Sequence, residues 1–264
     1  LIWVGETHVE AGYGNLVIGH RRYEGQKSTP PTIDGVLEEG EYGIAEVVPI
    51  TPFTGIYRVG DDADDPENHR FEWRLIHDED AIYVGVRVWD DNIVADTAEP
   101  NSEDGQTWVD DSIEIFFDSN ESNAAGRDTE EMFDGQFVYT TNGAWRDNEA
   151  NNPTFGEDAD WWAQSTVAAD GKSWDCEFVV KKATLVGGST EDAPIGFNIN
   201  INDDDSGARG FQLNWDGSPH NENTYGELIL LSCIPSDPGA CADRSVRFGT
   251  LDHKTGAVTE TVTI

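Results

Sequence analysis

The stretch Trp108-Val109-Asp110-Asp111-Ser112-Ile113-Glu114-Ile115-Phe116-Phe117-Asp118 decides the fold of this 264-residue chain. Its centre, residues 112–117, is rich in isoleucine and phenylalanine, which favour a β-strand. Two aspartates precede this run and another follows it, so carboxylates lie at both ends of the predicted strand. The stretch therefore predicts a hydrophobic strand whose ends are acidic.

Strand-like runs extend from this stretch in both directions. Residues 71–76 and 81–89 flank a four-residue turn and predict a β-hairpin. Clusters of Gly, Asn and Asp separate the runs, and no sustained helical periodicity occurs. The pattern predicts an all-β fold, a jelly-roll-like antiparallel β-sandwich. The other predicted strands of its body span residues 136–141, 161–167, 173–181, 195–202, 210–215 and 225–231.

Two terminal segments differ from this body. A polar Ser28-Thr29-Pro30-Pro31 spacer marks a boundary after two short apolar stretches. At the other end, residues 246–251 and 257–264 predict a second hairpin. We therefore expect three parts, which are an N-terminal strand arm at 1–32, the sandwich at 33–231 and a C-terminal extension with a hairpin at 232–264.

The charge of the chain excludes two classes of partner. Sixteen Lys and Arg against 52 Asp and Glu leave a net charge of −36 at pH 7. Such a surface repels phosphate backbones and anionic headgroups, so we expect neither nucleic-acid binding nor membrane insertion. Nine Trp and a hydrophobic content of 37% still support a packed core. The excess of Asp and the small number of Lys resemble the surface of a protein from high salt.

Several features favour an extracellular or cell-surface location. The chain begins with Leu1 rather than Met, as a processed product would, and Asn120 begins one glycosylation sequon. Cys233 and Cys241 flank a turn-rich loop, and a disulfide between them suits an oxidising compartment. Cys176 is left over, and we expect it to be a buried free thiol in a strand.

Further motifs accompany the central stretch in a fixed order along the chain. They are Ile33-Asp34-Gly35, residues 80–86 with Asp90-Asp91, Gln136-Phe137, the strand containing Glu177, residues 195–203 and Tyr225-Gly226-Glu227-Leu228. Together with residues 108–118, these motifs resemble the family 9 carbohydrate-binding modules. The resemblance covers residues 33–231 and leaves both terminal segments outside it.

The resemblance implies a calcium-supported β-sandwich in which two tryptophans hold a terminal sugar between their faces. The faces of a sugar ring pack on aromatic rings, and its hydroxyls need well-placed donors and acceptors. By this resemblance, Trp108 corresponds to the first tryptophan and Glu114 to a carboxylate that binds hydroxyls.

The chain departs from the family pattern at the other positions of this site. Val138 and Thr140 stand where an arginine and an asparagine are expected after Gln136-Phe137, and Pro219 and His220 stand where the second tryptophan is expected. The predicted sugar site is therefore incomplete. Its candidate residues are Trp108, Glu114, Thr140 and His220. Another stacking platform would come from Trp145, Trp161, Trp162 or Trp215, although each of these is more typical of a hydrophobic core.

Acidic pairs at the strand ends supply the hard oxygen ligands that calcium prefers. The expected ligands are Asp90, Asp91, Asp110, Asp111 and Asp203. A solvated surface is the ordinary explanation for any one cluster, but the family resemblance implies calcium support. We therefore expect at least one bound Ca²⁺, in a site without the spacing of an EF-hand loop.

Three functional hypotheses remain, and none is catalytic, because no nucleophile elbow, phosphate loop or H-E-x-x-H motif occurs. The leading hypothesis is a self-assembling surface or filament subunit with residual glycan binding, whose terminal strands add to the sheet of another copy. Its anchors are Leu1, Ile2, Trp3 and Val4. The alternative is an accessory carbohydrate-binding module of a secreted polysaccharide-degrading enzyme. The third is a haem-binding sandwich that uses Met132 and a partner such as His220.

Overall fold

The computed structural model describes most of the chain. Side chains are described for residues 21–52, 54–55, 69–119, 135–148, 153–185, 191–205 and 209–232. The backbone alone is described for Asp134 and for the strands at residues 2–3, 16–17, 58–59, 245–252 and 256–263. None of the helices in these parts has the length and hydrophobicity that a membrane span requires.

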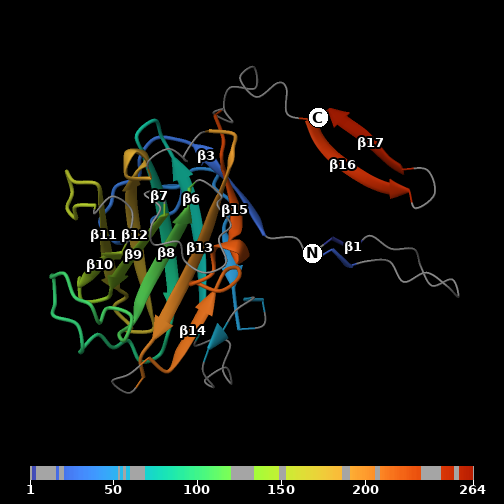
Figure 1. The fold of residues 1–264 in the computed structure, drawn as a ribbon. Helices are drawn as coiled ribbons and strands as arrows, with labels where there is room; N and C mark the ends of the chain where they lie inside the picture. Colours follow the sequence, from blue (N-terminus) through green and yellow to red (C-terminus); the bar gives the residue numbers. More distant parts are fainter. Residues whose placement is uncertain are drawn as a thin grey trace, which may run out of the picture.

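Two β-sheets pack face to face and form the body of the molecule (Figure 1). The first sheet contains β10 (Trp145–Asn148), β9 (Asp134–Thr140), β8 (Ser112–Asp118), β13 (Pro194–Asp203) and β15 (Gly226–Leu230), with β14 (Phe211–Asn214) and β5 (Arg58–Val59). The second contains β4 (Val48–Ile50), β6 (Arg70–His77), β7 (Ala81–Trp89), β12 (Ser173–Lys181) and β11 (Trp161–Val167). Pairing within each sheet is antiparallel. The predicted antiparallel β-sandwich is confirmed.

β3 (Arg22–Lys27) joins the two sheets, because it pairs in parallel with β15 on one side and with β6 on the other. Its Tyr23 is buried, donates a hydrogen bond to the carbonyl of Glu46 at 2.8 Å and accepts one from the amide of Leu75 at 3.0 Å. β3 lies within the segment predicted as an arm. The sandwich therefore begins before the polar spacer rather than after it.

The hydrophobic core lies between the sheets and follows from the two-residue period of the strands. On β8, Ile113, Ile115 and Phe117 belong to the core, while the alternate side chains face away from it. Trp73 of β6 reaches across to the first sheet, with its ring centroid 5.4 Å from that of Phe197. The outer face of the first sheet takes no part in this core, so it can carry polar groups.

A segment at residues 33–47 covers the outer face of the second sheet, and Glu177 of β12 holds it there. The buried carboxylate of Glu177 accepts hydrogen bonds from the amides of Asp34 and Gly35, both at 3.0 Å, and from the hydroxyl of Tyr42 at 3.1 Å. Gly35 has a φ of +79°, and a Cβ there would lie 2.8 Å from the backbone of Ser165. The close contact with Ser165 therefore requires glycine at position 35, the last residue of the Ile33-Asp34-Gly35 motif.

The predicted terminal strands are present. β1 (Ile2–Trp3) pairs with β2 (Leu16–Val17), and β16 (Ser245–Asp252) pairs with β17 (Gly256–Thr263). Among the described strands, neither pair is hydrogen-bonded to the sandwich. Cys176 is a buried free thiol, as expected. Other predicted residues lie outside the described part of the chain, namely Leu1, Val4, Asn120, Met132, Cys233 and Cys241.

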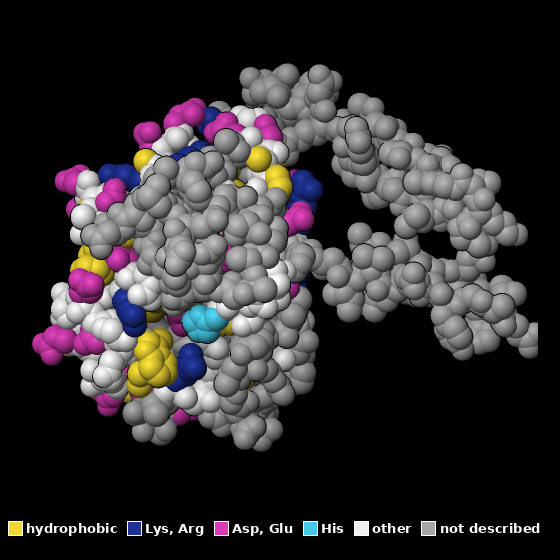
Figure 2. Space-filling view, in the orientation of Figure 1, with side chains coloured by type: hydrophobic (Ala, Val, Ile, Leu, Met, Phe, Trp, Pro, Cys, Tyr) yellow, Lys and Arg dark blue, Asp and Glu magenta, His cyan; other side chains and the backbone are white. Residues whose placement is uncertain are grey.

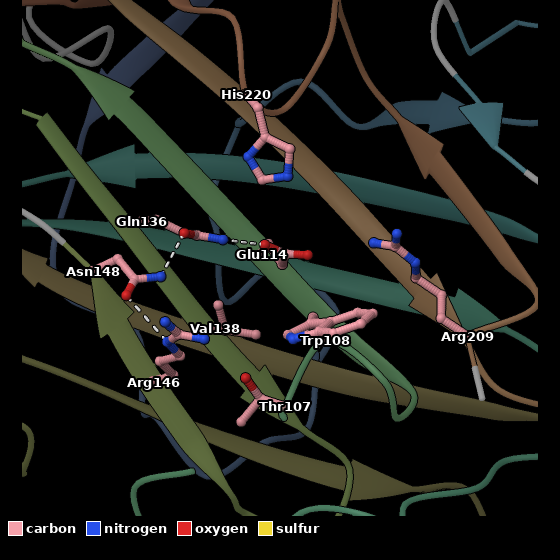
Figure 3. Close-up of a pocket in the computed structure, with 9 residues that line it drawn as sticks. All are labelled: Thr107, Trp108, Glu114, Gln136, Val138, Arg146, Asn148, Arg209 and His220. Carbon is pink, nitrogen blue, oxygen red and sulfur yellow. Dashed lines mark hydrogen bonds between the residues drawn. The ribbon is translucent and has the colours of Figure 1, made fainter. Parts of the chain in front are cut away.

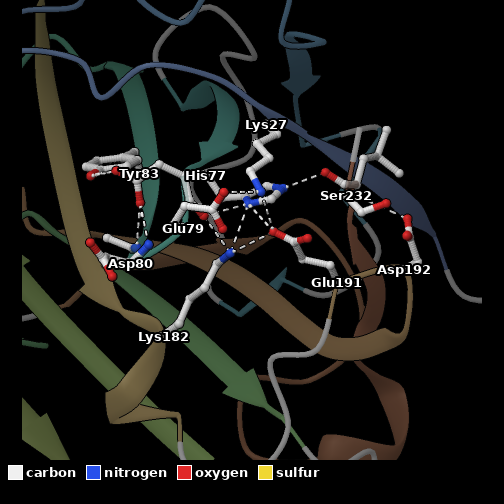
Figure 4. A network of polar contacts seen from close by, with 12 residues as sticks. Lys27, His77, Glu79, Asp80, Tyr83, Lys182, Glu191, Asp192 and Ser232 are labelled. Atoms are coloured by element: carbon white, nitrogen blue, oxygen red, sulfur yellow. Dashed lines mark hydrogen bonds and ion pairs between the residues drawn. The ribbon is translucent and has the colours of Figure 1, made fainter. Parts of the chain in front are cut away.

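A buried polar network ties β3 to the ends of β6 and β15 (Figure 4). The Nε2 atom of His77 donates to the carbonyl of Leu231 at 3.1 Å, and its Nδ1 atom accepts from the ammonium of Lys182 at 3.1 Å. The carboxylate of Glu191 forms an ion pair with the ammonium of Lys27 at 3.1 Å and another with that of Lys182 at 3.5 Å. The Nδ1 atom also lies 3.1 Å from the carbonyl oxygen of Asp78. A positive charge on the imidazole would stand beside the ammonium of Lys182, so burial and this contact favour the neutral form of His77.

His77 is expected to make the protein less stable in acid. Burial lowers the pKa of His77, and the nearby Lys182 lowers it further, against the carbonyls of Asp78 and Leu231. The unfolded chain then takes up a proton at a pH where the folded protein does not, so stability falls as the pH drops through about 6.5. Urea unfolding at pH 7.5 and 5.5 should show a larger loss of stability for the wild type than for His77→Gln. Equal losses would contradict this role.

Candidate functional site

A pocket of about 320 Å³ opens on the outer face of the first sheet. Strands β8, β9 and β10 supply Glu114, Gln136, Val138, Arg146 and Asn148, and loops supply Thr107, Trp108, Arg209 and His220 (Figure 3). Figure 2 shows a hydrophobic, a histidine and two cationic side chains gathered on this face. The volume lies in the range of small-molecule sites.

The pocket floor follows from the register of three neighbouring strands. Glu114 of β8 lies opposite Val138 of β9 on one side and Asn200 of β13 on the other. Because side chains alternate along each strand, these residues share the face that points away from the core. The hydrophobic run that predicts β8 thus also places its single carboxylate, Glu114, in the floor of the pocket.

A set of side-chain amides holds the carboxylate of Glu114. Asn200 and Asn202 donate to one of its oxygens at 3.0 Å and 2.6 Å, and Gln136 donates to the other. Glu114 itself is only 2% exposed. Its acceptor capacity is therefore directed mainly into the protein, which fixes the floor before any ligand binds.

The hydrogen-bonded set continues onto β10. Asn148 donates to the side-chain carbonyl of Gln136 at 2.8 Å, and the Nε atom of Arg146 donates to Asn148 at 3.1 Å. A second bond runs from the Nη1 atom of Arg146 to the carbonyl of Gly105 at 2.9 Å. Among the described residues, neutral neighbours rather than a carboxylate position Arg146.

Trp108 forms an exposed aromatic wall of the pocket. Its side chain lies in the loop before β8 and the residue is 43% exposed, whereas Trp73, Trp161, Trp174 and Trp215 are buried. The guanidinium of Arg209, which precedes β14, lies 5.0 Å from the ring centroid of Trp108. His220 enters from the loop before η2 (Glu222–Thr224), and its ring meets Phe116 edge-on at 6.4 Å.

The structure brings together three of the four predicted sugar-site residues. Trp108, Glu114 and His220 line the pocket, whereas Thr140 does not. Thr140 is buried, and its hydroxyl donates to Asn142 at 2.7 Å and to the carbonyl of Ala144 at 3.1 Å, which closes the turn between β9 and β10. The predicted contact of Thr140 with a sugar therefore lacks a structural basis.

The alternative tryptophan platform is not assembled. Trp161 and Trp215 lie in the core, and Trp162 packs against the cluster that covers the second sheet. Trp145 stacks on Phe155 with a centroid separation of 4.5 Å and an interplanar angle of 12°. These tryptophans therefore contribute to packing, as the sequence analysis expected for each of them.

An arginine and an asparagine that were not among the predicted site residues also line the pocket. They are Arg146 and Asn148 of β10, not the residues at 138 and 140 of β9. Sequence reasoning missed β10 because it has only four residues, all of them half-buried. The alternation of Arg146 and Asn148 around Asp147, whose carboxylate faces the Trp161 indole at 2.8 Å, is the signal that would have found them.

Acidic side chains converge where β7 and β13 end and β8 begins. Ligand atoms of Asp90, Asp111 and Asp203 lie within 4.8 Å of one another. His69 with Asp203 and Asp205, and Asp91 with Asp90 and Asp205, form overlapping groups. Of the predicted metal ligands, Asp90, Asp91, Asp111 and Asp203 are thus brought together.

Asp110 belongs to a separate group with Asp96 and Asp204. Its carboxylate accepts hydrogen bonds from the amides of Thr97 at 3.0 Å and Ala98 at 2.8 Å, so it also shapes the loop that precedes β8.

The electrostatics of the first acidic group fit a cation. Burial, and next to it the neighbouring Asp90, raise the pKa of Asp111 to about 10. Buried carboxylates at this spacing repel one another unless a proton or a cation lies among them. Oxygen atoms from several aspartates suit the coordination that Ca²⁺ prefers.

A β-sandwich that carries an aromatic-walled, hydrogen-bonding pocket on one face has the architecture of a carbohydrate-binding module. The chain belongs to the carbohydrate family 9 binding domain-like family, whose profile matches residues 33–232. The resemblance drawn from the sequence motifs is therefore confirmed.

Solved structures show the same fold. A family 9 carbohydrate-binding module from Caldicellulosiruptor kristjanssonii, in complex with cellotriose, has a TM-score of 0.60 and 18% identity over 82% of this chain and 97% of that chain. Its complex with glucose gives 0.60 and 19% over 81% and 98%. A protein from Bacteroides uniformis ATCC 8492 gives 0.53 and 15% over 80% and 99%. No curated protein sequence matches the chain.

Proposed function

We propose that residues 33–232 form a non-catalytic module that binds a sugar in the pocket between Trp108 and His220. One observation carries the proposal, which is that the exposed ring of Trp108 stands beside a floor of fixed hydrogen-bonding groups. An aromatic face binds the apolar face of a sugar ring, while placed polar groups recognise its hydroxyls. The complexes of the Caldicellulosiruptor module with cellotriose and glucose support this assignment.

Binding to saccharides tests the proposal directly. Retention of the protein on insoluble polysaccharides and calorimetric titration with soluble saccharides, neutral and acidic, should reveal at least one ligand that quenches or shifts tryptophan fluorescence. Competition by that soluble ligand should release the protein from the polysaccharide. A folded protein that binds no member of a broad saccharide panel would overturn the proposal.

We also propose that calcium supports the module, with Asp90, Asp111 and Asp203 as its main ligands. Chelation at low ionic strength should then lower the thermal unfolding midpoint, because the carboxylates repel one another without screening. A ligand present at 100 times its dissociation constant stabilises the folded state by about 2.7 kcal/mol. Melting curves with and without chelator measure the effect, and readdition of Ca²⁺ should reverse it. Identical curves would count against a structural ion.

Self-assembly through the terminal segments is a second candidate function. The pairs β1–β2 and β16–β17 are not hydrogen-bonded to the described sandwich strands, and a two-stranded sheet alone is marginally stable in water. Addition of these strands to another copy would satisfy their edges and build a homopolymer at the cell surface. An accessory module of a secreted polysaccharide-degrading enzyme remains the alternative context for the same pocket.

Deletion of residues 1–18 separates these contexts. If the N-terminal strands join copies, the full chain should assemble at high protein concentration and the shortened chain should stay a folded monomer. The size distribution from light scattering measures the difference. A full-length chain that stays monomeric at high concentration and high salt would reject self-assembly and leave the sugar-binding proposal untouched.

A further inference from the structure

The pocket holds two arginines that have no carboxylate partner among the described residues. Arg146 bonds to Asn148 and to the carbonyl of Gly105, and Arg209 bonds to Asn202 at 3.3 Å and lies over the ring of Trp108. Five other described cations lie within 4 Å of a carboxylate, namely Arg22, Lys27, Arg74, Arg87 and Lys182.

The guanidinium of Arg209 keeps one edge available. Its Nη1 atom donates to Asn202, while its Nε and Nη2 atoms have no hydrogen-bond partner among the described residues. Nε and Nη2 form the planar edge that binds a carboxylate or a sulfate with two parallel hydrogen bonds. Figure 3 shows Arg209 and Arg146 approaching Trp108 from opposite sides.

The single carboxylate of the lining does not neutralise these arginines. Glu114 is 2% exposed, and its oxygens already accept from Asn200, Asn202 and Gln136. The accessible wall of the pocket is therefore richer in cationic donors than in acceptors. A neutral sugar offers hydroxyls that both donate and accept, whereas an anionic substituent only accepts and matches this wall better.

We propose that the pocket selects a saccharide that carries an anionic group, a carboxylate or a sulfate, which Arg209 binds while the sugar ring lies on Trp108. Arg146 adds positive potential from the other side. This inference rests on the proposed sugar-binding function. The net charge of −36 opposes the approach of an anion, but at physiological ionic strength screening acts within about 8 Å, so the local arginines decide the affinity.

The test compares matched monosaccharide glycosides at 0.15 M NaCl and pH 7. Titration with a methyl glucoside, the corresponding methyl glucuronide and a 6-sulfated methyl glucoside should show that at least one acidic form binds about tenfold or more tightly than the neutral one, as a charge-assisted hydrogen bond predicts. The two acidic arms distinguish carboxylate from sulfate recognition.

Variants assign the preference to the arginines. Arg209→Gln should bring the ratio of acidic to neutral affinity close to one, Arg209→Lys should keep part of it, and Arg146→Gln should reduce it less. Lys181→Gln removes one charge outside the pocket and should leave the ratio unchanged. A neutral sugar that binds as tightly as the acidic forms, or a ratio that Arg209→Gln does not change, overturns the inference while leaving sugar binding intact. Absence of binding to any saccharide refutes the proposed function itself.

Discussion

Replacing Trp108 with alanine should weaken sugar binding at least about 30-fold and shift the thermal unfolding midpoint by no more than about 2 °C. Truncation of a central aromatic contact costs about 2 kcal/mol or more, and 1.4 kcal/mol is a factor of ten in affinity. The ring is 43% exposed and lies outside the core clusters, so its loss leaves the packing of the sandwich unchanged. Substitutions of exposed side chains usually change stability by less than about 0.5 kcal/mol.

Trp162→Ala provides the matched control. Trp162 is half-buried against the cluster on the outer face of the second sheet, on the other side of the sandwich from the pocket. Its removal should lower stability but leave the affinity of the folded protein for sugar unchanged. Calorimetric titration and thermal unfolding of both variants give the two readouts. Wild-type affinity in Trp108→Ala would show that the tryptophan is structural and that any sugar binds elsewhere.

Replacing Glu177 with alanine should lower the free energy of unfolding by about 3–5 kcal/mol. The change leaves the amides of Asp34 and Gly35 and the hydroxyl of Tyr42 without their acceptor. Each buried polar group that loses its partner costs about 1–3 kcal/mol, and partial hydration of the loosened segment reduces the sum. Denaturant unfolding measures the loss.

Two further variants test the cause. Glu177→Gln keeps one carbonyl acceptor, and burial already makes the charge of Glu177 unfavourable because it raises the pKa to about 7. The glutamine variant should therefore lose clearly less stability than the alanine variant. Glu24→Ala removes an exposed carboxylate on β3 and should change stability by less than about 0.5 kcal/mol. If Glu177→Ala behaves like Glu24→Ala, the carboxylate does not anchor residues 33–47.

Local patterns in the sequence were sufficient for the main strands and the family. The isoleucine- and phenylalanine-rich run at residues 112–117 predicts β8, because these residues favour strands. The two-residue period of a strand then places Glu114 on the face opposite to Ile113 and Ile115, which belong to the core. The family motifs also single out Trp108, since its place before this strand needs no knowledge of other strands.

Only the tertiary structure added the two arginines to the site. Arg146 reaches the pocket because β10 pairs with β9, and Arg209 because β14 pairs with β13. His220, which the family pattern had already marked, reaches it through a loop far along the chain. β3 likewise pairs with strands that are distant in the sequence, one in each sheet. The polar spacer after β3 suggested a boundary there, so the sequence alone did not assign β3 to the sandwich. A short strand has too few residues to show a period, and its partners are chosen by burial across the whole sandwich. The sequence by itself therefore determined the fold class and the pocket residues Trp108, Glu114 and His220, while the packing of distant strands determined the rest of the pocket's chemistry.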